Sequence, residues 1–144
     1  MTRSRTILVF GDQLNLSIGA LATAEPARDR VLLVESTEKI SAKEWHPQRL
    51  HFYLSSMRHF ADDLGRQGFS VDYVRARSFR EAIDEYLRAN PQQQLVATEP
   101  NSFGARRLLE NLGVETVVSN QFLLHHASFA TWVETRREKG YKTF

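Results

Sequence analysis

The 144-residue sequence contains no cysteine, which excludes disulfides, thiol nucleophiles and cysteine-ligated zinc or iron–sulfur sites within this chain. It also lacks any apolar run approaching the roughly 18 residues of a transmembrane helix, and the apolar stretch after Arg5 is too short for a signal peptide. Lysine and arginine total 19 against 17 aspartates and glutamates, so the net charge of +2 does not indicate nucleic-acid binding. We therefore expect a soluble, cytoplasmic protein that does not bind membranes.

Phosphate-binding and catalytic motifs are also missing after the first apolar run. The residues there are Gly11, Asp12 and Gln13, whereas a dinucleotide fingerprint needs G-x-G-x-x-G and a P-loop needs G-x-x-x-x-G-K-S/T. A phosphoaspartate receiver needs clustered acids and a lysine after the last strand, but only Asp12 is suitably placed. No G-x-S-x-G context indicates a hydrolase. The sequence therefore predicts no catalytic residue.

Five short β-branched runs alternate with longer amphipathic segments. The first two runs are apolar on both faces, as in a parallel sheet covered by helices. We predict strands at Thr6–Phe10, Arg30–Glu35, Ser70–Ala76, Gln94–Glu99 and Val114–Ser119. We predict helices at Pro47–Gly65, Phe79–Ala89 and Ser102–Leu112, the first with an inward face of Leu50, Leu54, Met57, Ala61 and Leu64. This order predicts one α/β domain over residues 1–144: a five-stranded parallel sheet flanked by helices, in a Rossmann-like or flavodoxin-like three-layer sandwich.

Polar residues follow three of the predicted strands at their carboxyl ends. They are residues 11–13 after the first strand, Glu35 and Ser36 at the end of the second, and residues 99–101 after the fourth. In doubly wound sheets ligands bind at this edge, near the point where the strand order reverses. A ligand role for Asp12 is therefore one interpretation, and an N-cap carboxylate before a helix over residues 16–22 is the other.

The histidines give no metal-binding pattern. His51 and His59 are eight positions apart on the long predicted helix. His125 and His126 are adjacent, so in a regular element their side chains would diverge, and we predict no metal site. The basic segment Arg136–Lys142 fits the charged face of a terminal helix better than a phosphate-binding patch.

Five stretches follow one another in a specific order: LVFGDQL, VLLVES, HPQRLHFYLSSMRHFADDL, TEP and FLLHHASFATW. Together they resemble the amino-terminal domain of the prokaryotic photolyase-related proteins, the iron–sulfur bacterial branch of the cryptochrome and photolyase family. The resemblance implies a non-catalytic domain of a deoxyribodipyrimidine photolyase-related flavoprotein, which repairs DNA in light or senses blue light. It also implies a separate helical domain that binds FAD, a 4Fe–4S cluster and DNA, with residues from about 128 to 144 beginning the connector to it.

The resemblance further implies an antenna-chromophore crevice, of the kind that holds a ribityllumazine, at the carboxyl edge of the sheet. We expect it to be formed by Phe10, Gly11, Asp12, Gln13, Glu35, Ser36, Lys39, Tyr53 and Met57. Lys39 and Tyr53 depart from the family pattern, which has a carboxylate and a small aliphatic residue there. Because lysine cannot accept a ring N–H bond and a phenol fills space, we expect weak or no lumazine binding. The alternatives are a stand-alone nucleotide-binding or regulatory α/β domain, and an interaction module marked by a large exposed apolar patch.

Overall fold

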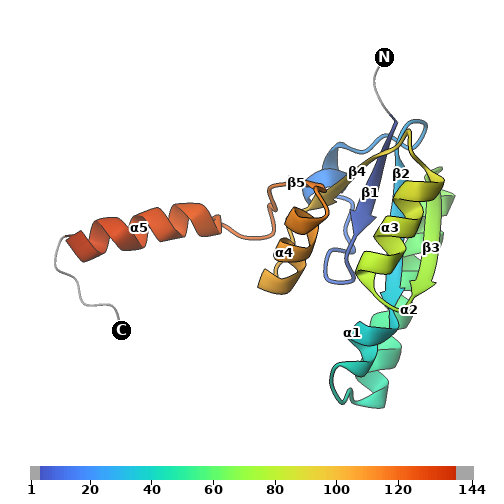
Figure 1. The fold of residues 1–144 in the computed structure, drawn as a ribbon, viewed down its shortest axis with the longest axis horizontal. Coiled ribbons are helices and arrows are strands. Elements are labelled where there is room, and N and C mark those ends of the chain that lie inside the picture. Colours follow the sequence, from blue (N-terminus) through green and yellow to red (C-terminus); the bar gives the residue numbers. More distant parts are fainter. Residues whose placement is uncertain (1–3, 139–144) are drawn as a thin grey trace.

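The computed structural model describes residues 4–138, in which strands alternate with helices along the chain (Figure 1). The strands are β1 (Arg5–Val9), β2 (Arg30–Ser36), β3 (Ser70–Ala76), β4 (Gln94–Thr98) and β5 (Glu115–Val117). The helices are the 3-10 helix η1 (Gly19–Thr23), α1 (Thr37–Ser41), α2 (Pro47–Arg66), α3 (Phe79–Ala89), α4 (Phe103–Asn111) and α5 (His126–Glu138).

The five strands form one parallel sheet in the order β3-β2-β1-β4-β5. Ile7 of β1 lies opposite Val31 of β2 on one side and Val96 of β4 on the other. The chain extends the sheet from β1 through β2 to β3 and then returns to the other side of β1 for β4. The strand order therefore reverses between β1 and β4, and the predicted five-stranded parallel sheet is confirmed.

Side chains of the central strands alternate between two hydrophobic cores. Ile7 and Val9 of β1 pack with η1 and α2 on one face, and Leu8 packs with α3 and α4 on the other. Figure 1 shows α3 and α4 in front of the sheet and α2 behind it. Because β1 and β2 are covered on both faces, the consecutive residues Ile7–Val9 and Val31–Val34 are all apolar and buried. The predicted three-layer arrangement is confirmed.

Helix α2 is longer than the face that it packs against. Met57, Ala61 and Leu64 are buried, whereas Leu50 and Leu54 are only half-buried. The first turns of α2 extend beyond the carboxyl ends of the strands, beside α1 (Figure 1). The predicted inward face is therefore fully buried at its last three positions and only partly buried at its first two.

Other differences from the predicted elements are local. In place of the helix expected over residues 16–22, the structure has the 3-10 helix η1, which begins three residues later. Its N-cap is Ile18, which makes no side-chain capping bond, so Asp12 does not cap this helix. The short helix α1 was not predicted; its N-cap Ser36 accepts a hydrogen bond from the Lys39 backbone N–H at 3.2 Å. The edge strand β5 spans three residues rather than the six predicted. The other edge strand, β3, has the predicted bounds Ser70–Ala76, so β5 is the strand whose length was predicted least well.

Helix α5 projects away from the sheet (Figure 1). None of its residues is buried, and Phe129 and Trp132 stack on each other with 53% and 51% exposure. The predicted connector from about residue 128 therefore begins inside this helix, and its part at 139–144 lies outside the described residues. Across residues 4–138, no helix has both the length and the apolar character needed to cross a bilayer.

Candidate functional site

A crevice opens at the carboxyl edge of the sheet, where the strand order reverses between β1 and β4. Its volume of about 500 Å³ is within the range of small-molecule sites. Its walls come from the turns after β1 and β4, from the segment joining α1 to α2, and from α4. The lining residues are Phe10, Gly11, Asp12, Lys39, Lys43, Trp45, Arg49, Tyr53, Phe79, Pro100, Asn101, Ser102, Gly104, Ala105 and Leu108. Open α/β sheets bind ligands at this position.

Two aromatic pairs line the crevice. Trp45 stacks on Tyr53 with ring centroids 5.7 Å apart at 29°, and Phe10 packs against Phe79 at 5.4 Å. The indole Nε1 of Trp45 is buried and has no hydrogen-bond partner among the described residues. Because buried donors are normally paired, this indole is suited to an acceptor on a ligand. The crevice therefore combines apolar walls with a free donor, as sites for flat heterocycles do.

Tyr53 lies directly against Gly11. A Cβ atom added to Gly11 would overlap the Tyr53 ring, with Cζ only 2.5 Å away. Gly11 does not have a positive φ, so the close approach of the ring, rather than the backbone conformation, requires glycine here. Burial raises the pKa of the Tyr53 phenol, and the Asp12 carboxylate raises it further. The hydroxyl therefore stays protonated at neutral pH.

The charge around the crevice is mostly positive. Lys39, Lys43 and Arg49 line it together with a single carboxylate, Asp12. Lys43 Nζ lies 4.4 Å from the centroid of the Trp45 ring, and the Arg49 guanidinium carbon lies 5.5 Å from it. A ring bound beside Trp45 would therefore lie among cations, which favours an electron-rich or anionic ligand.

Hydrogen bonds join the loops that form the rim. Asn101 Nδ2 donates to the Asp12 carboxylate at 2.9 Å, and Gln121 Nε2 donates to the Asp12 carbonyl at 3.1 Å. Gln13 is buried and its Nε2 donates to the Glu99 carbonyl at 3.0 Å. The loops after β1, β4 and β5 are thus fixed to one another across the point where the strand order reverses.

The structure brings together five of the nine residues predicted for the crevice: Phe10, Gly11, Asp12, Lys39 and Tyr53. The other four are not among its lining residues. Gln13 joins two loops, Ser36 caps α1 and donates to the Arg77 carbonyl at 3.2 Å, and Met57 is buried in the core at 1% exposure. These three side chains therefore stabilise the loops, a helix end and the core.

Glu35, the fourth of these, belongs to an ion-pair cluster. Its carboxylate accepts a hydrogen bond from Arg58 Nε at 2.8 Å and another from the Tyr73 hydroxyl, and it lies 3.2 Å from Arg75 Nε. Burial alone would raise the pKa of Glu35, but the hydrogen bonds from Arg58 and Tyr73 outweigh it and hold the pKa below its usual value. The carboxylate is thus fully engaged and joins β2, β3 and α2.

Sequence reasoning missed the crevice residues in the segment between α1 and α2 and in the first turn of α2. Lys43 and Trp45 precede the predicted helix Pro47–Gly65 and belong to no predicted element, and Arg49 lies in the first turn of that helix. The signal of this segment was a tryptophan two residues before the proline that begins a helix, with Lys43 on one side and Arg49 on the other; His46 is the N-cap and Pro47 starts α2. Such a segment holds its aromatic side chain at the end of the helix and next to the strand ends.

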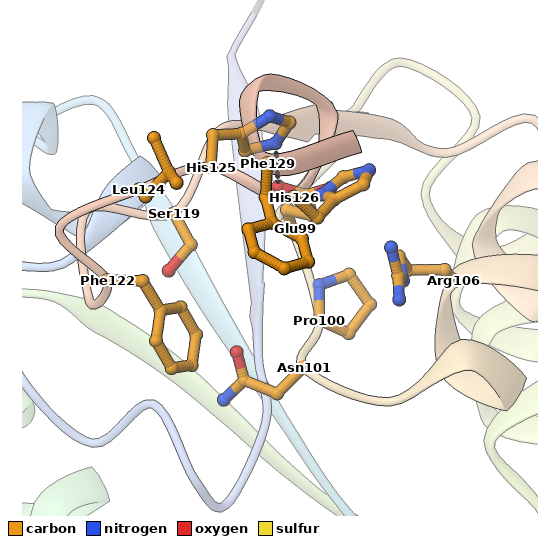
Figure 2. Close-up of a pocket in the computed structure, with 10 residues that line it drawn as sticks. All are labelled: Glu99, Pro100, Asn101, Arg106, Ser119, Phe122, Leu124, His125, His126 and Phe129. Atoms are coloured by element: carbon orange, nitrogen blue, oxygen red, sulfur yellow. Dashed lines mark hydrogen bonds and ion pairs between the residues drawn. The ribbon is translucent and has the colours of Figure 1, made fainter. Parts of the chain in front are cut away.

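A second cavity, of about 280 Å³, lies beside Glu99, which directly follows β4 (Figure 2). His125 Nε2 lies 2.7 Å from one oxygen of the Glu99 carboxylate, and His126 Nδ1 lies 3.2 Å from the other. The expectation that adjacent histidines diverge is wrong here. His125 precedes α5 and His126 begins it, so helical spacing does not separate them, and the imidazole centroids are 4.1 Å apart.

Comparison with known proteins identifies the family of this chain. Residues 7–144 match the model of the family described as deoxyribodipyrimidine photo-lyase-related protein. The chain belongs to this family. The photolyase-related chain is also similar to a (6-4) photolyase of Agrobacterium fabrum, with 28% identity over 153 aligned residues. The alignment covers 98% of the photolyase-related chain but 30% of that relative, so the chain spans less than a third of the relative's length. The family resemblance inferred from the sequence is confirmed.

Proposed function

We propose that this chain is the amino-terminal, non-catalytic part of a cytoplasmic, light-dependent photolyase-related flavoprotein, and that its crevice holds a flat antenna chromophore. The observation that carries the proposal is the aromatic-walled cavity between the ends of β1 and β4. Stacked Trp45 and Tyr53 provide a surface for a ring, and the buried Trp45 Nε1 provides a donor. Asp12 and Ser102 provide polar atoms for a hydroxylated tail.

The fit to a ribityllumazine is incomplete at the two positions that depart from the family pattern. Lys39 lines the crevice where a carboxylate acceptor is expected, and Tyr53 covers Gly11 where an aliphatic residue would leave room. A buried hydrogen bond that loses one partner costs about 1–3 kcal/mol. Since 1.4 kcal/mol is tenfold in affinity, lumazine affinity should be lower by a factor of about 10–100 than in a crevice with both family residues.

Titration of the purified chain with 6,7-dimethyl-8-ribityllumazine tests this proposal. We expect weak binding by the parent chain, and gains of about tenfold or more in Lys39→Glu and in Tyr53→Ile. Arg88→Glu, a charge reversal on α3 away from the lining residues, is the matched control and should change nothing. Tight binding by the parent would contradict the role of the two departures. No binding by the double variant would contradict the assignment of the crevice.

A mononucleotide-binding regulatory domain is the second candidate, and the cations favour it. Lys39, Lys43 and Arg49 surround the aromatic pair, although no glycine-rich loop is present to bind a phosphate. Flavin mononucleotide and riboflavin share a ring and differ in one phosphate. Tighter binding of the mononucleotide, lost on raising the salt concentration, would support this candidate, while equal affinities would favour a neutral chromophore.

We propose that FAD, a 4Fe–4S cluster and DNA are bound by a separate helical domain that docks on α5. This chain has no cysteine to ligate a cluster, and Phe129 and Trp132 on α5 are exposed. Such exposed aromatic side chains suit an interface with another domain. The purified 144-residue chain should accordingly contain no flavin and show no visible-light repair activity. Stoichiometric flavin in its absorption spectrum would contradict this assignment.

A further inference from the structure

We propose that Glu99, His125 and His126 form a binding site for a divalent transition metal such as Zn²⁺, independent of the crevice. Two imidazoles and one carboxylate are a donor set that zinc uses in sites with one open coordination position. The three side chains converge on one point at the edge of the cavity (Figure 2). Imidazole donors also select zinc, nickel, copper or iron over magnesium and calcium, which prefer oxygen.

The distances are already close to those of a coordinated metal. One ligand atom from each of the three residues lies within 4.8 Å of the others, and the two carboxylate–imidazole distances are 2.7 Å and 3.2 Å. With metal–ligand bonds of about 2.0–2.1 Å in a tetrahedron, neighbouring ligand atoms are about 3.3 Å apart. Metal binding therefore requires small adjustments of side chains that already point at one another.

The surroundings complete a site for one further ligand. Glu99 and His125 are only partly exposed, with side-chain exposures of 17% and 29%. Arg106 lines the same cavity, and its Nε is buried with no hydrogen-bond partner among the described residues. An anion or hydroxide at the open metal position would lie in this cavity, where the Arg106 donor is available to it. A plain ion pair between Glu99 and His125 would leave that donor unexplained.

A metal at this point would join the end of β4 to the start of α5. Glu99 directly follows the strand, and His126 is the first residue of the helix. Because α5 has no buried residue of its own, its direction depends on contacts near its first turn. The proposal therefore departs from the sequence-based expectation of no metal, and it gives the adjacent histidines a role in fixing the helix.

Isothermal titration of the tag-free 144-residue chain with Zn²⁺ tests the proposal. We expect saturable binding of one ion per chain, and no comparable binding of Mg²⁺. Replacing a residue that merely orients a metal ligand typically weakens metal binding 10–100-fold. Because His125→Ala, His126→Ala and Glu99→Gln each remove a ligand itself, each should weaken Zn²⁺ binding by about tenfold or more. The matched control, His51→Ala with His59→Ala, removes two imidazoles from α2 and should retain the parent affinity.

Two further readouts separate a metal site from an ion pair. Co²⁺ should give visible absorption bands of a four-coordinate site in the parent, and these should be absent in the His125→Ala/His126→Ala variant. Circular dichroism without metal should show that each variant is folded. The proposal is overturned if Zn²⁺ does not bind saturably in the micromolar range, or if binding persists in the double histidine variant. Failure of the lumazine titration would not affect these results, because different side chains are measured.

Discussion

The contact between Gly11 and Tyr53 permits a direct test of how the crevice is filled. In Gly11→Ala the added methyl would overlap the end of the Tyr53 ring, so the ring must move. Overpacking typically costs about 1–3 kcal/mol. Because the overlapping atoms are at the far end of a side chain on the projecting part of α2, the ring can rotate, and we expect a loss of unfolding free energy near the lower limit.

A double-mutant cycle isolates this contact. Isoleucine at position 53 has no atoms where the phenol ring lies, so Gly11→Ala should be nearly neutral in a Tyr53→Ile background. The coupling free energy should therefore be about 1 kcal/mol, within the range for residues in contact. Gly65→Ala is the matched control: nothing lies within 4 Å of an added Cβ there, and alanine in a helix is more stable than glycine by about 0.5–1 kcal/mol.

Urea denaturation followed by far-ultraviolet circular dichroism measures the parent and the four variants on one scale. The emission of Trp45 should also change in Gly11→Ala, because this indole stacks on the displaced ring. A coupling below about 0.5 kcal/mol would show that Tyr53 does not lie against Gly11 in solution. The crevice would then be open, and the expected weakness of lumazine binding would lose its steric basis.

Three other outcomes follow from the same geometry. In urea denaturation, Met57→Ala should lower the unfolding free energy by about 2–5 kcal/mol, and Leu54→Ala by clearly less because Leu54 is only half-buried. Equal losses in the two variants would show that the orientation of α2 on the sheet is wrong. The pKa of Glu35 in the folded protein is below its ordinary value of 4.5, so the ionised carboxylate stabilises the fold at pH values above 4.5. This stabilisation is lost as the pH falls through the pKa of the folded protein. Acid should therefore destabilise Glu35→Gln less than the parent, and equal acid sensitivity in urea titrations would contradict this. The purified chain should not bind duplex DNA tightly at physiological salt in fluorescence anisotropy, because its net charge is only +2; tight, salt-resistant binding would refute this.

The interior of the fold was predictable because burial on both faces leaves a direct mark on the sequence. The consecutive residues Ile7–Val9 of β1 and Val31–Val34 of β2 are all apolar, and the structure buries them between α2 and the pair α3 and α4. Strand β5 has no such constraint and is half as long as predicted, whereas the other edge strand, β3, has the predicted bounds. Leu50 and Leu54 show the same limit: helical periodicity identifies a face but not where the underlying sheet ends.

The candidate crevice was predictable in part, and the part that failed has a physical cause. Position after a strand indicated Phe10, Gly11 and Asp12, which do line the crevice, because parallel strands end at a common edge. It also selected Glu35, which is instead neutralised by cations from α2 and β3. A carboxylate at a strand end is the same residue in the sequence whether it faces a ligand or an arginine. Only the positions of the partner side chains distinguish the two.

The segment after β4 shows why the second site could not be found in this way. Pro100 and Asn101 line both the crevice and the smaller cavity, so the same turn faces two sites. Towards the crevice, Asn101 donates to Asp12 from the neighbouring strand end, a contact that strand order anticipates. Towards the smaller cavity, Glu99 contacts histidines 26 positions or more away along the chain, on a loop that ends at α5. That contact depends on the path of the chain after β5, and no periodicity encodes this path.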